Sequence, residues 1–236
     1  MTDLERKEIL KKAKIFFKNS IILKHVSKLS SLSKLSTYNY NPYLIKYLAI
    51  FLSGKYDYDS IAKVLLYPRV LGTSISTSFG SNIQKFISGV LGKYGSSTLG
   101  IDIEFIDKKD GRKKYCQLKS GPETINKDDV VTISNHFNTI KNLAKTNNLD
   151  LRVNDLVVGV LYGNKSDLST FYKTLQKTYE VIPGQEFWER LTGDKLFYKD
   201  LINAFAEVTS TAGGHKKLKQ TLKDLAASIK HSGVFM

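Results

Sequence analysis

The chain has 236 residues, of which 42% are hydrophobic and 25% charged, values typical of a globular protein that buries a sizeable core. The longest apolar runs are too short to span a bilayer, and the charged first residues lack the apolar stretch of a secretory signal, so we expect a soluble, cytoplasmic protein. Its single cysteine, Cys116, excludes an intramolecular disulfide and a zinc site built from several thiolates of one chain.

The charge balance favours a polyanionic partner. Lys and Arg number 36 against 22 Asp and Glu, which gives 36 − 22 = +14. Nucleic acid is a better candidate than a membrane because no basic amphipathic helix with an aromatic apolar face is found. A Lys-rich composition inherited from an AT-rich genome would give the same excess without any polyanion, so charge alone does not establish binding.

The first seventy residues have the pattern of helices. Apolar residues recur at helical spacing in residues 3–26, 43–52 and 57–66. Asn41-Pro42 is a favourable start for the second of these segments. Residues 28–40 are rich in Ser and have no settled period, so we expect a loop there. We interpret residues 1–70 as a helical subdomain for dimerisation, DNA contact, or both.

A segment of small and hydroxyl-bearing residues follows, GTSISTSFG at residues 72–80. We expect it to precede a helix over residues 81–91 and to turn backbone N–H groups, with Ser76 and Ser78, toward DNA phosphates. It lacks the spacing and the Lys of a nucleotide-binding P-loop. Within the helix, Gln84 is a candidate to face a functional site, although an exposed Gln on a helix is commoner.

Residues 100–121, GIDIEFIDKKDGRKKYCQLKSG, have the pattern of a hairpin with polar residues at regular intervals. Asp110-Gly111 is a favoured two-residue turn, and the flanking segments have strand-like composition. This turn predicts that Asp102 lies opposite Lys119 and that Glu104 lies opposite Gln117.

Side chains alternate along a strand, so these four polar residues are expected to share one face of the hairpin. The other face would then carry Ile103, Phe105, Cys116 and Leu118, which predicts that Cys116 is a core residue. Ordinary cross-strand pairs on a solvated face would give the same pattern. Against this, the Gly-Pro exit after Lys119 places this lysine near a strand end, where α/β proteins usually build their sites.

The rest of the chain predicts a mixed α/β fold. Asn126 and Asp128 are candidate caps of a helix that reaches Lys145, and residues 155–162 form a continuous apolar run typical of a strand buried on both faces. Residues 179–182 are expected to form a short edge strand. Further helices are predicted over residues 168–177, 185–191 and 201–230, the last interrupted by Gly213-Gly214. We therefore expect an α/β (α+β) core over residues 71–195, a mixed sheet flanked by helices, and a basic helical segment over residues 196–236.

The order of Asp102, Gln117-Leu118-Lys119, a helix and a buried strand resembles the PD-(D/E)XK nuclease core, in its variant with Gln in place of the second acid. The segments SFGSNIQKFISGVLG, GIDIEFID, QLKSGPETIN, DLVVGVLYGN and PGQEFWERL are similar, in this order, to the type II restriction endonucleases that cut RGGNCCY and to the PmeII-type enzymes. YNYNPYLIKY adds to this similarity, which spans roughly residues 39–195.

The resemblance implies a homodimeric, Mg²⁺-dependent restriction endonuclease that cuts double-stranded DNA at a palindromic site and works with a companion DNA methyltransferase. It implies that Asp102 and the Leu118 backbone carbonyl bind the metal and that Lys119 orients the attacking water. Gln117 departs from the commoner Asp or Glu, and Glu104, on the same predicted face, is the first candidate to supply the missing charge. Ser120 and Asn126 are further candidate DNA contacts.

Two alternatives remain open on the sequence. One is a non-catalytic, basic DNA-binding protein in which Gln117 marks a degenerate nuclease core. The other is a nuclease of the same core that acts on structured or damaged DNA. Binding without cutting would favour the first, and sequence-defined cuts in plain duplex DNA would exclude the second.

Overall fold

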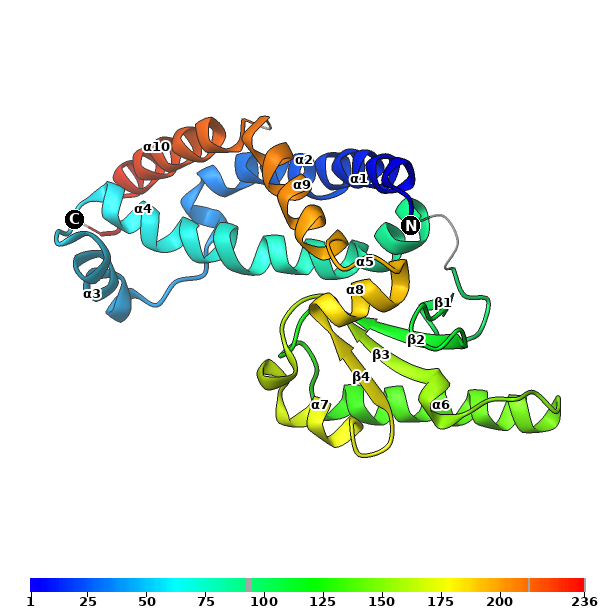
Figure 1. Ribbon diagram of the computed structural model, residues 1–236. Coiled ribbons are helices and arrows are strands. Elements are labelled where there is room, and N and C mark those ends of the chain that lie inside the picture. Colours follow the sequence, from blue (N-terminus) through cyan, green and yellow to red (C-terminus); the bar gives the residue numbers. More distant parts are fainter. Residues whose placement is uncertain (92–94, 212, 236) are drawn as a thin grey trace. The chain divides into compact units, whose positions relative to one another are not determined.

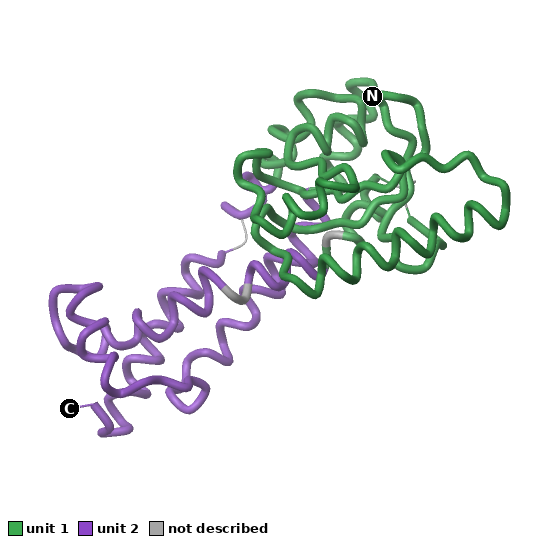
Figure 2. Tube along the Cα trace, turned by 90° about the horizontal axis from the view of Figure 1, so that it is seen from below, with its two compact units in different colours: residues 1–13, 82–204 green, residues 14–81, 205–236 purple. Residues whose placement is uncertain are grey.

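The computed structural model describes residues 1–91, 95–211 and 213–235. Contacts within the chain divide it into two compact units, coloured separately in Figure 2. We call residues 1–13 and 82–204 the sheet unit, and residues 14–81 and 205–236 the helical unit. The roles expected of the segments 1–70, 71–195 and 196–236 stay predictions. None of the helices in the described ranges is long and apolar enough to cross a membrane.

The sheet unit is built on a four-stranded mixed sheet (Figure 1). Its strands are β1 (Ile103–Ile106), β2 (Lys113–Lys119), β3 (Leu156–Val160) and β4 (Glu180–Pro183), in the order β1-β2-β3-β4. β1 is antiparallel to β2, whereas β2, β3 and β4 run parallel. The parallel pairs require crossovers, which contain α6 (Lys127–Thr146) and α7 (Thr170–Leu175). The predicted mixed α/β fold is confirmed.

Helices cover both faces of this sheet (Figure 1). α6 and α7 cover one face, and their residues Phe137 and Tyr172 belong to the same buried cluster as Val158 of β3. α8 (Gly184–Thr192) covers the other face, where the ring of Phe187 would lie 2.5 Å from a Cβ placed on Gly159. Because a side chain at residue 159 has no room, the close approach of α8 requires a glycine in this strand.

Several predictions for this unit are confirmed. Every residue of β3 is buried, β4 is an edge strand, and Asn126 is the N-cap of α6. Cys116 is a buried free cysteine, and burial raises the pKa of its thiol. The Asn126 cap forms a reciprocal pair with Asp129, three residues on, and not with Asp128.

The predicted hairpin register is wrong by two residues. Glu104 pairs with Tyr115, where the Asp110-Gly111 turn predicts Gln117. Asp102 precedes the first residue of β1, and its amide donates to the Cys116 carbonyl. An even shift leaves every side chain on its predicted face because the faces alternate from residue to residue. The four residues predicted to face the core are indeed buried: Ile103, Phe105, Cys116 and Leu118.

The register differs because the connection between β1 and β2 is longer than a two-residue turn. The Asp107 amide donates to the Arg112 carbonyl at 2.9 Å, and the Gly111 amide donates to the Asp107 carbonyl at 2.8 Å. Residues 108–111 therefore form the loop, and Gly111 ends it with a φ of 70°, which glycine adopts without strain. The side chain of Asp107 is fully buried, so tertiary contacts hold the loop in this form.

The helical unit has its own core. Buried residues of α3 (Pro42–Ser53), α4 (Tyr58–Tyr67) and α10 (Gly214–Ser232) form one cluster. The other helices in the described part of the chain are α1 (Asp3–Phe17), η1 (Lys18–Ile22), α2 (Leu23–Lys28), η2 (Leu29–Ser33), η3 (Leu35–Thr37), η4 (Pro68–Ser74), α5 (Ile75–Leu91) and α9 (Phe197–Thr211), together with η5 (Val153–Asp155) and η6 (Lys165–Asp167), two short 3₁₀ helices of the sheet unit. The break predicted at Gly213-Gly214 separates α9 from α10.

Two loop predictions are wrong. Residues 28–40 contain the 3₁₀ helices η2 and η3, because Leu29 and Leu35 join the buried cluster of the helical unit. Residues 72–80 are helical, within η4 and α5, so their backbone N–H groups do not precede a helix at residue 81. Directly after this segment, the Ser81 hydroxyl donates to the Thr77 carbonyl at 3.0 Å, within its own helix.

Candidate active site

The candidate site lies where β2 ends. Asp102 immediately precedes β1, and Gln117 and Lys119 lie at the carboxyl end of β2. The crossover helix α6 runs back along β2, as a βαβ unit requires, so its first turns lie beside the end of this strand. Residues distant in sequence therefore meet at one edge of the sheet.

The Asp102 carboxylate is tied to β2 by one hydrogen bond. The Leu118 amide donates to Asp102 Oδ2 at 2.7 Å, and the Asp102 amide donates to the Cys116 carbonyl at 3.1 Å. Burial raises the pKa of Asp102, although the Leu118 amide and the nearby positive charge of Lys119 act to lower it. A partly desolvated carboxylate of this kind is stabilised by a cation beside it.

Gln117 is held in one orientation by two acceptors. Its side chain is buried, and Nε2 lies 2.6 Å from the Gly100 carbonyl oxygen and 2.6 Å from Nδ1 of His136, on α6. Gly100 has a φ of 79°, and a Cβ there would lie 2.5 Å from the His136 ring. Glycine at residue 100 thus allows both the backbone conformation and the close approach of the imidazole.

Lys119 is paired with a residue that the sequence analysis did not select. Its Nζ lies 2.8 Å from Oδ1 of Asp129, whose other oxygen accepts the Asn126 amide at 3.0 Å. Although burial opposes it, the Lys119 hydrogen bond holds the pKa of Asp129 below its ordinary value. The lysine is therefore oriented by α6, while its charge still acts on Asp102.

Glu104 belongs to a different cluster from the one predicted. Its Oε1 accepts from Ser96 at 2.6 Å and from Thr98 at 2.7 Å, and its Oε2 pairs with Lys113 at 2.6 Å. These bonds hold the pKa of Glu104 below its ordinary value in spite of its burial. With both oxygens engaged, and with Tyr115 as its partner in the register, Glu104 is not brought to Asp102 and Gln117.

The supporting candidates divide between the two units. Gln84 of α5 does reach the site, because its Nε2 donates to the Asp102 carbonyl at 3.2 Å. Ser120 follows Lys119 directly, whereas Asn126 is engaged as the cap of α6. Ser76 and Ser78 lie in the part of α5 that belongs to the helical unit. A role in DNA contact stays a prediction for Ser76, Ser78, Ser120 and Asn126.

The oxygens of this cluster suit a hard divalent cation. No described group donates a hydrogen bond to Asp102 Oδ1 or Gln117 Oε1, so the lone pairs of both oxygens are available to a ligand. The Leu118 carbonyl faces the same strand edge as its amide. The described residues hold no group of three or more His, Cys, Asp or Glu side chains suited to a metal. A cation here would depend on these three oxygens and on water, which Mg²⁺ accepts as ligands.

Sequence reasoning missed His136 and Asp129. A signal for both was present, since they lie seven residues apart on a predicted helix and therefore share one face. The antiparallel course of a crossover helix then sets Asp129 beside Lys119 and His136 beside Gln117. The register along the helix, however, comes only from packing.

Comparison with protein-family models identifies a family for this chain. The family model described as type II restriction endonuclease EcoO109I matches residues 6–211, which include the whole sheet and every residue of the candidate site. A search of the curated proteins finds no match.

Proposed function

We propose, for a chain that belongs to the type II restriction endonuclease EcoO109I family, that Asp102, Gln117 and Lys119 cut double-stranded DNA within a short palindromic site. As a member of this family the protein is a site-specific DNA endonuclease, a hydrolase of phosphodiester bonds. The proposal assigns the activity to the Gln variant of the PD-(D/E)XK pattern. The observation that supports it most is that Asp102 Oδ1 and Gln117 Oε1 accept no hydrogen bond from the described residues, while the charge of Lys119 acts on Asp102.

Enzymes of this family generally use a divalent metal, and we propose Mg²⁺ for this one. Asp102 Oδ1, Gln117 Oε1 and the Leu118 carbonyl would hold it. When bound, the ion would lower the pKa of a coordinated water and place a positive charge beside the scissile phosphate. Lys119, oriented by Asp129, stabilises the negative charge that develops on the phosphate as water attacks phosphorus and a P–O bond breaks.

Plasmid cleavage tests this assignment. The purified protein with Mg²⁺ should give discrete fragments, and Lys119→Met should lower the rate by about 10²–10³-fold, the usual loss when one transition-state charge partner is removed. A gel-shift assay without Mg²⁺ should show that this variant still binds DNA.

Lys113→Met is the matched control, because Lys113 is also on β2 but pairs with Glu104 outside the site. It should cut as the wild type does. Undiminished cleavage by Lys119→Met would refute the assignment. Binding by the wild type without cleavage under any divalent metal would instead support the non-catalytic DNA-binding alternative.

The proposed function includes partners. We propose a companion DNA methyltransferase that protects the same site on the host chromosome, which places both enzymes in the cytoplasm. A two-fold symmetric site is matched by a two-fold symmetric protein that delivers one active site to each strand, so we also propose a homodimer.

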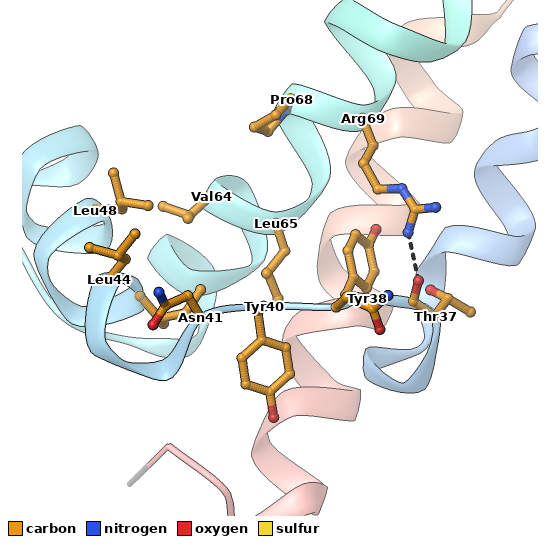
Figure 3. Close-up of a pocket in the computed structure, with 12 residues that line it drawn as sticks. Thr37, Tyr38, Tyr40, Asn41, Leu44, Leu48, Val64, Leu65, Pro68 and Arg69 are labelled. Atoms are coloured by element: carbon orange, nitrogen blue, oxygen red, sulfur yellow. Dashed lines mark hydrogen bonds between the residues drawn. The ribbon is translucent and has the colours of Figure 1, made fainter.

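Helix α3 is the surface that best fits this dimer. Tyr43, Tyr47 and Phe51, four residues apart, form one stripe along it and are 90%, 60% and 76% exposed. Beside the stripe, Leu44 and Leu48 line a pocket with Val64 and Leu65 of α4, and at its other end Arg69 donates to the Thr37 carbonyl at 2.6 Å (Figure 3). An apolar stripe of this kind is typical of a surface that another protein covers.

Phe51→Lys is expected to convert the dimer to a monomer and to slow double-strand cleavage, because a charge would be buried in the contact. Analytical ultracentrifugation measures the mass. Leu149→Lys, at a residue 57% exposed in the sheet unit, is the control and should stay dimeric. A dimer that survives Phe51→Lys unchanged would exclude α3 as the interface.

A further inference from the structure

The orientation of the Gln117 amide follows from one neighbour that can only accept. A backbone carbonyl has no hydrogen to donate, so the group 2.6 Å from the Gly100 oxygen must be the Gln117 NH₂. The same Nε2 lies 2.6 Å from His136 Nδ1. His136 Nδ1 must therefore accept the second amide hydrogen of Gln117, which requires the neutral imidazole that carries its proton on His136 Nε2.

With both amide hydrogens engaged, the amide oxygen is the atom left to face the site. Oε1 accepts no hydrogen bond from the described residues, although the Gln117 side chain is buried. A free Gln side chain would present NH₂ or oxygen with similar ease, since the two differ by a half-turn about the last side-chain bond. A flipped NH₂ could not bind a cation.

We infer that His136 is a positioning residue that locks the Gln117 amide with its oxygen toward the metal, and so lets a neutral side chain serve where the nuclease pattern commonly has an acid. The inference rests on the proposed function, because it concerns the same metal site. His136 itself acts through Gln117 and contacts neither cation nor DNA in this assignment.

The rest of the structure fits a positioning role better than a purely structural one. His136 is only partly buried and is absent from the apolar cluster that α6 forms with the sheet. The ring is fitted against Gly100, where any Cβ would displace it. Helix α6 also orients Lys119 through Asp129, so a single element sets the geometry of both Gln117 and Lys119.

Two substitutions separate the acceptor from the ring. His136→Asn keeps an acceptor oxygen the same number of bonds from Cα as Nδ1, whereas His136→Leu removes it. Outer-shell partners of metal ligands commonly contribute 10–100-fold to metal affinity. We expect His136→Leu to raise the Mg²⁺ concentration for half-maximal cleavage by about 10-fold or more at an unchanged KM for DNA. His136→Asn should restore most of the loss, and Asn135→Leu, next on α6 and exposed, controls for the helix.

Two readouts do not depend on cleavage. Calorimetric titration of Mg²⁺ into the DNA-free protein should show the same order of affinities, with wild type and His136→Asn above His136→Leu. Nitrogen-15 NMR of the wild-type imidazole should show His136 with its proton on Nε2 and a bare Nδ1. A proton on Nδ1, or equal Mg²⁺ affinity in the Leu and Asn variants, would overturn the inference. If the wild type cuts DNA but the Mg²⁺ affinities and the His136 tautomer differ from those expected, only the positioning role of His136 is refuted. If the wild type does not cut DNA, the proposed function is refuted.

Discussion

Replacing Asp102 with Asn is expected to abolish DNA cleavage while it raises the melting temperature of the metal-free protein. Removing the carboxylate takes away the negative charge of the proposed metal ligand Asp102. Lewis-acid stabilisation is worth several kcal/mol, and about 1.4 kcal/mol corresponds to a tenfold change in rate, so we expect a loss of at least ~10³-fold. Plasmid cleavage under single-turnover conditions measures it.

The gain in stability follows from the raised pKa of Asp102. A carboxyl whose pKa is higher in the folded than in the unfolded state destabilises the fold once the pH exceeds these values, and has no such effect below its unfolded pKa. Asn carries no charge and keeps an oxygen for the Leu118 amide, so it removes this penalty. Its advantage should be present at about pH 7 and should vanish as the pH falls below about 4.

Mg²⁺ should reverse this order. A ligand that binds the folded state stabilises it by mass action, so wild type should gain stability as Mg²⁺ is added and Asp102→Asn should not. Asp59→Asn, in the exposed first turn of α4, is the control and should cut DNA normally and lose at most a few tenths of a kcal/mol. Cleavage by Asp102→Asn at the wild-type rate would contradict the proposed role, and a lower melting temperature at neutral pH would contradict the electrostatic argument.

Replacing Arg190 with Met is expected to destabilise the protein by about 3–5 kcal/mol, because it leaves the buried carboxylate of Asp107 unpaired. Arg190 of α8 is 5% exposed, and its Nε donates to Asp107 at 2.8 Å. The same guanidinium pairs with Glu180 of β4. Although burial opposes it, these two carboxylates raise the pKa of Arg190 above its ordinary value. Arg190 thus joins α8 to the β1–β2 loop through Asp107 and to the edge strand β4 through Glu180.

Urea unfolding monitored through the buried Trp188 measures this loss. Asp107→Leu combined with Arg190→Met should recover part of it, since an apolar pair leaves no buried charge unpaired. Lys195→Met is the control, because Lys195 is 79% exposed in its pair with Glu189 and should change the free energy of unfolding by no more than about 0.5 kcal/mol. A double variant no more stable than Arg190→Met alone would show that the guanidinium acts mainly through packing.

The same contact explains where prediction of the hairpin failed. Asp110-Gly111 is a strong local turn signal, yet the loop spans residues 108–111 because Asp107 is held by Arg190, which is 83 residues away in sequence. Local turn preferences are worth little against a buried ion pair. The error does not change which face the side chains are predicted to occupy, because side chains alternate along a strand with a period of two residues.

Local sequence patterns are sufficient to predict the periodic features of this protein. Alternation predicts a shared face for Asp102, Gln117 and Lys119, continuous apolar content identified β3, and the Asn126 cap placed the start of α6. These depend on neighbours a few residues apart, and local spacing encodes them.

The groups that meet at the site are set by long-range packing. Glu104 contacts Ser96, Thr98 and Lys113. Asp129 contacts Lys119, and His136 contacts Gln117. Such pairings depend on the register of a helix against a strand, which side-chain packing over the whole sheet sets. No local pattern carries that register, so the chemistry of the site could be proposed from the sequence but its partners could not.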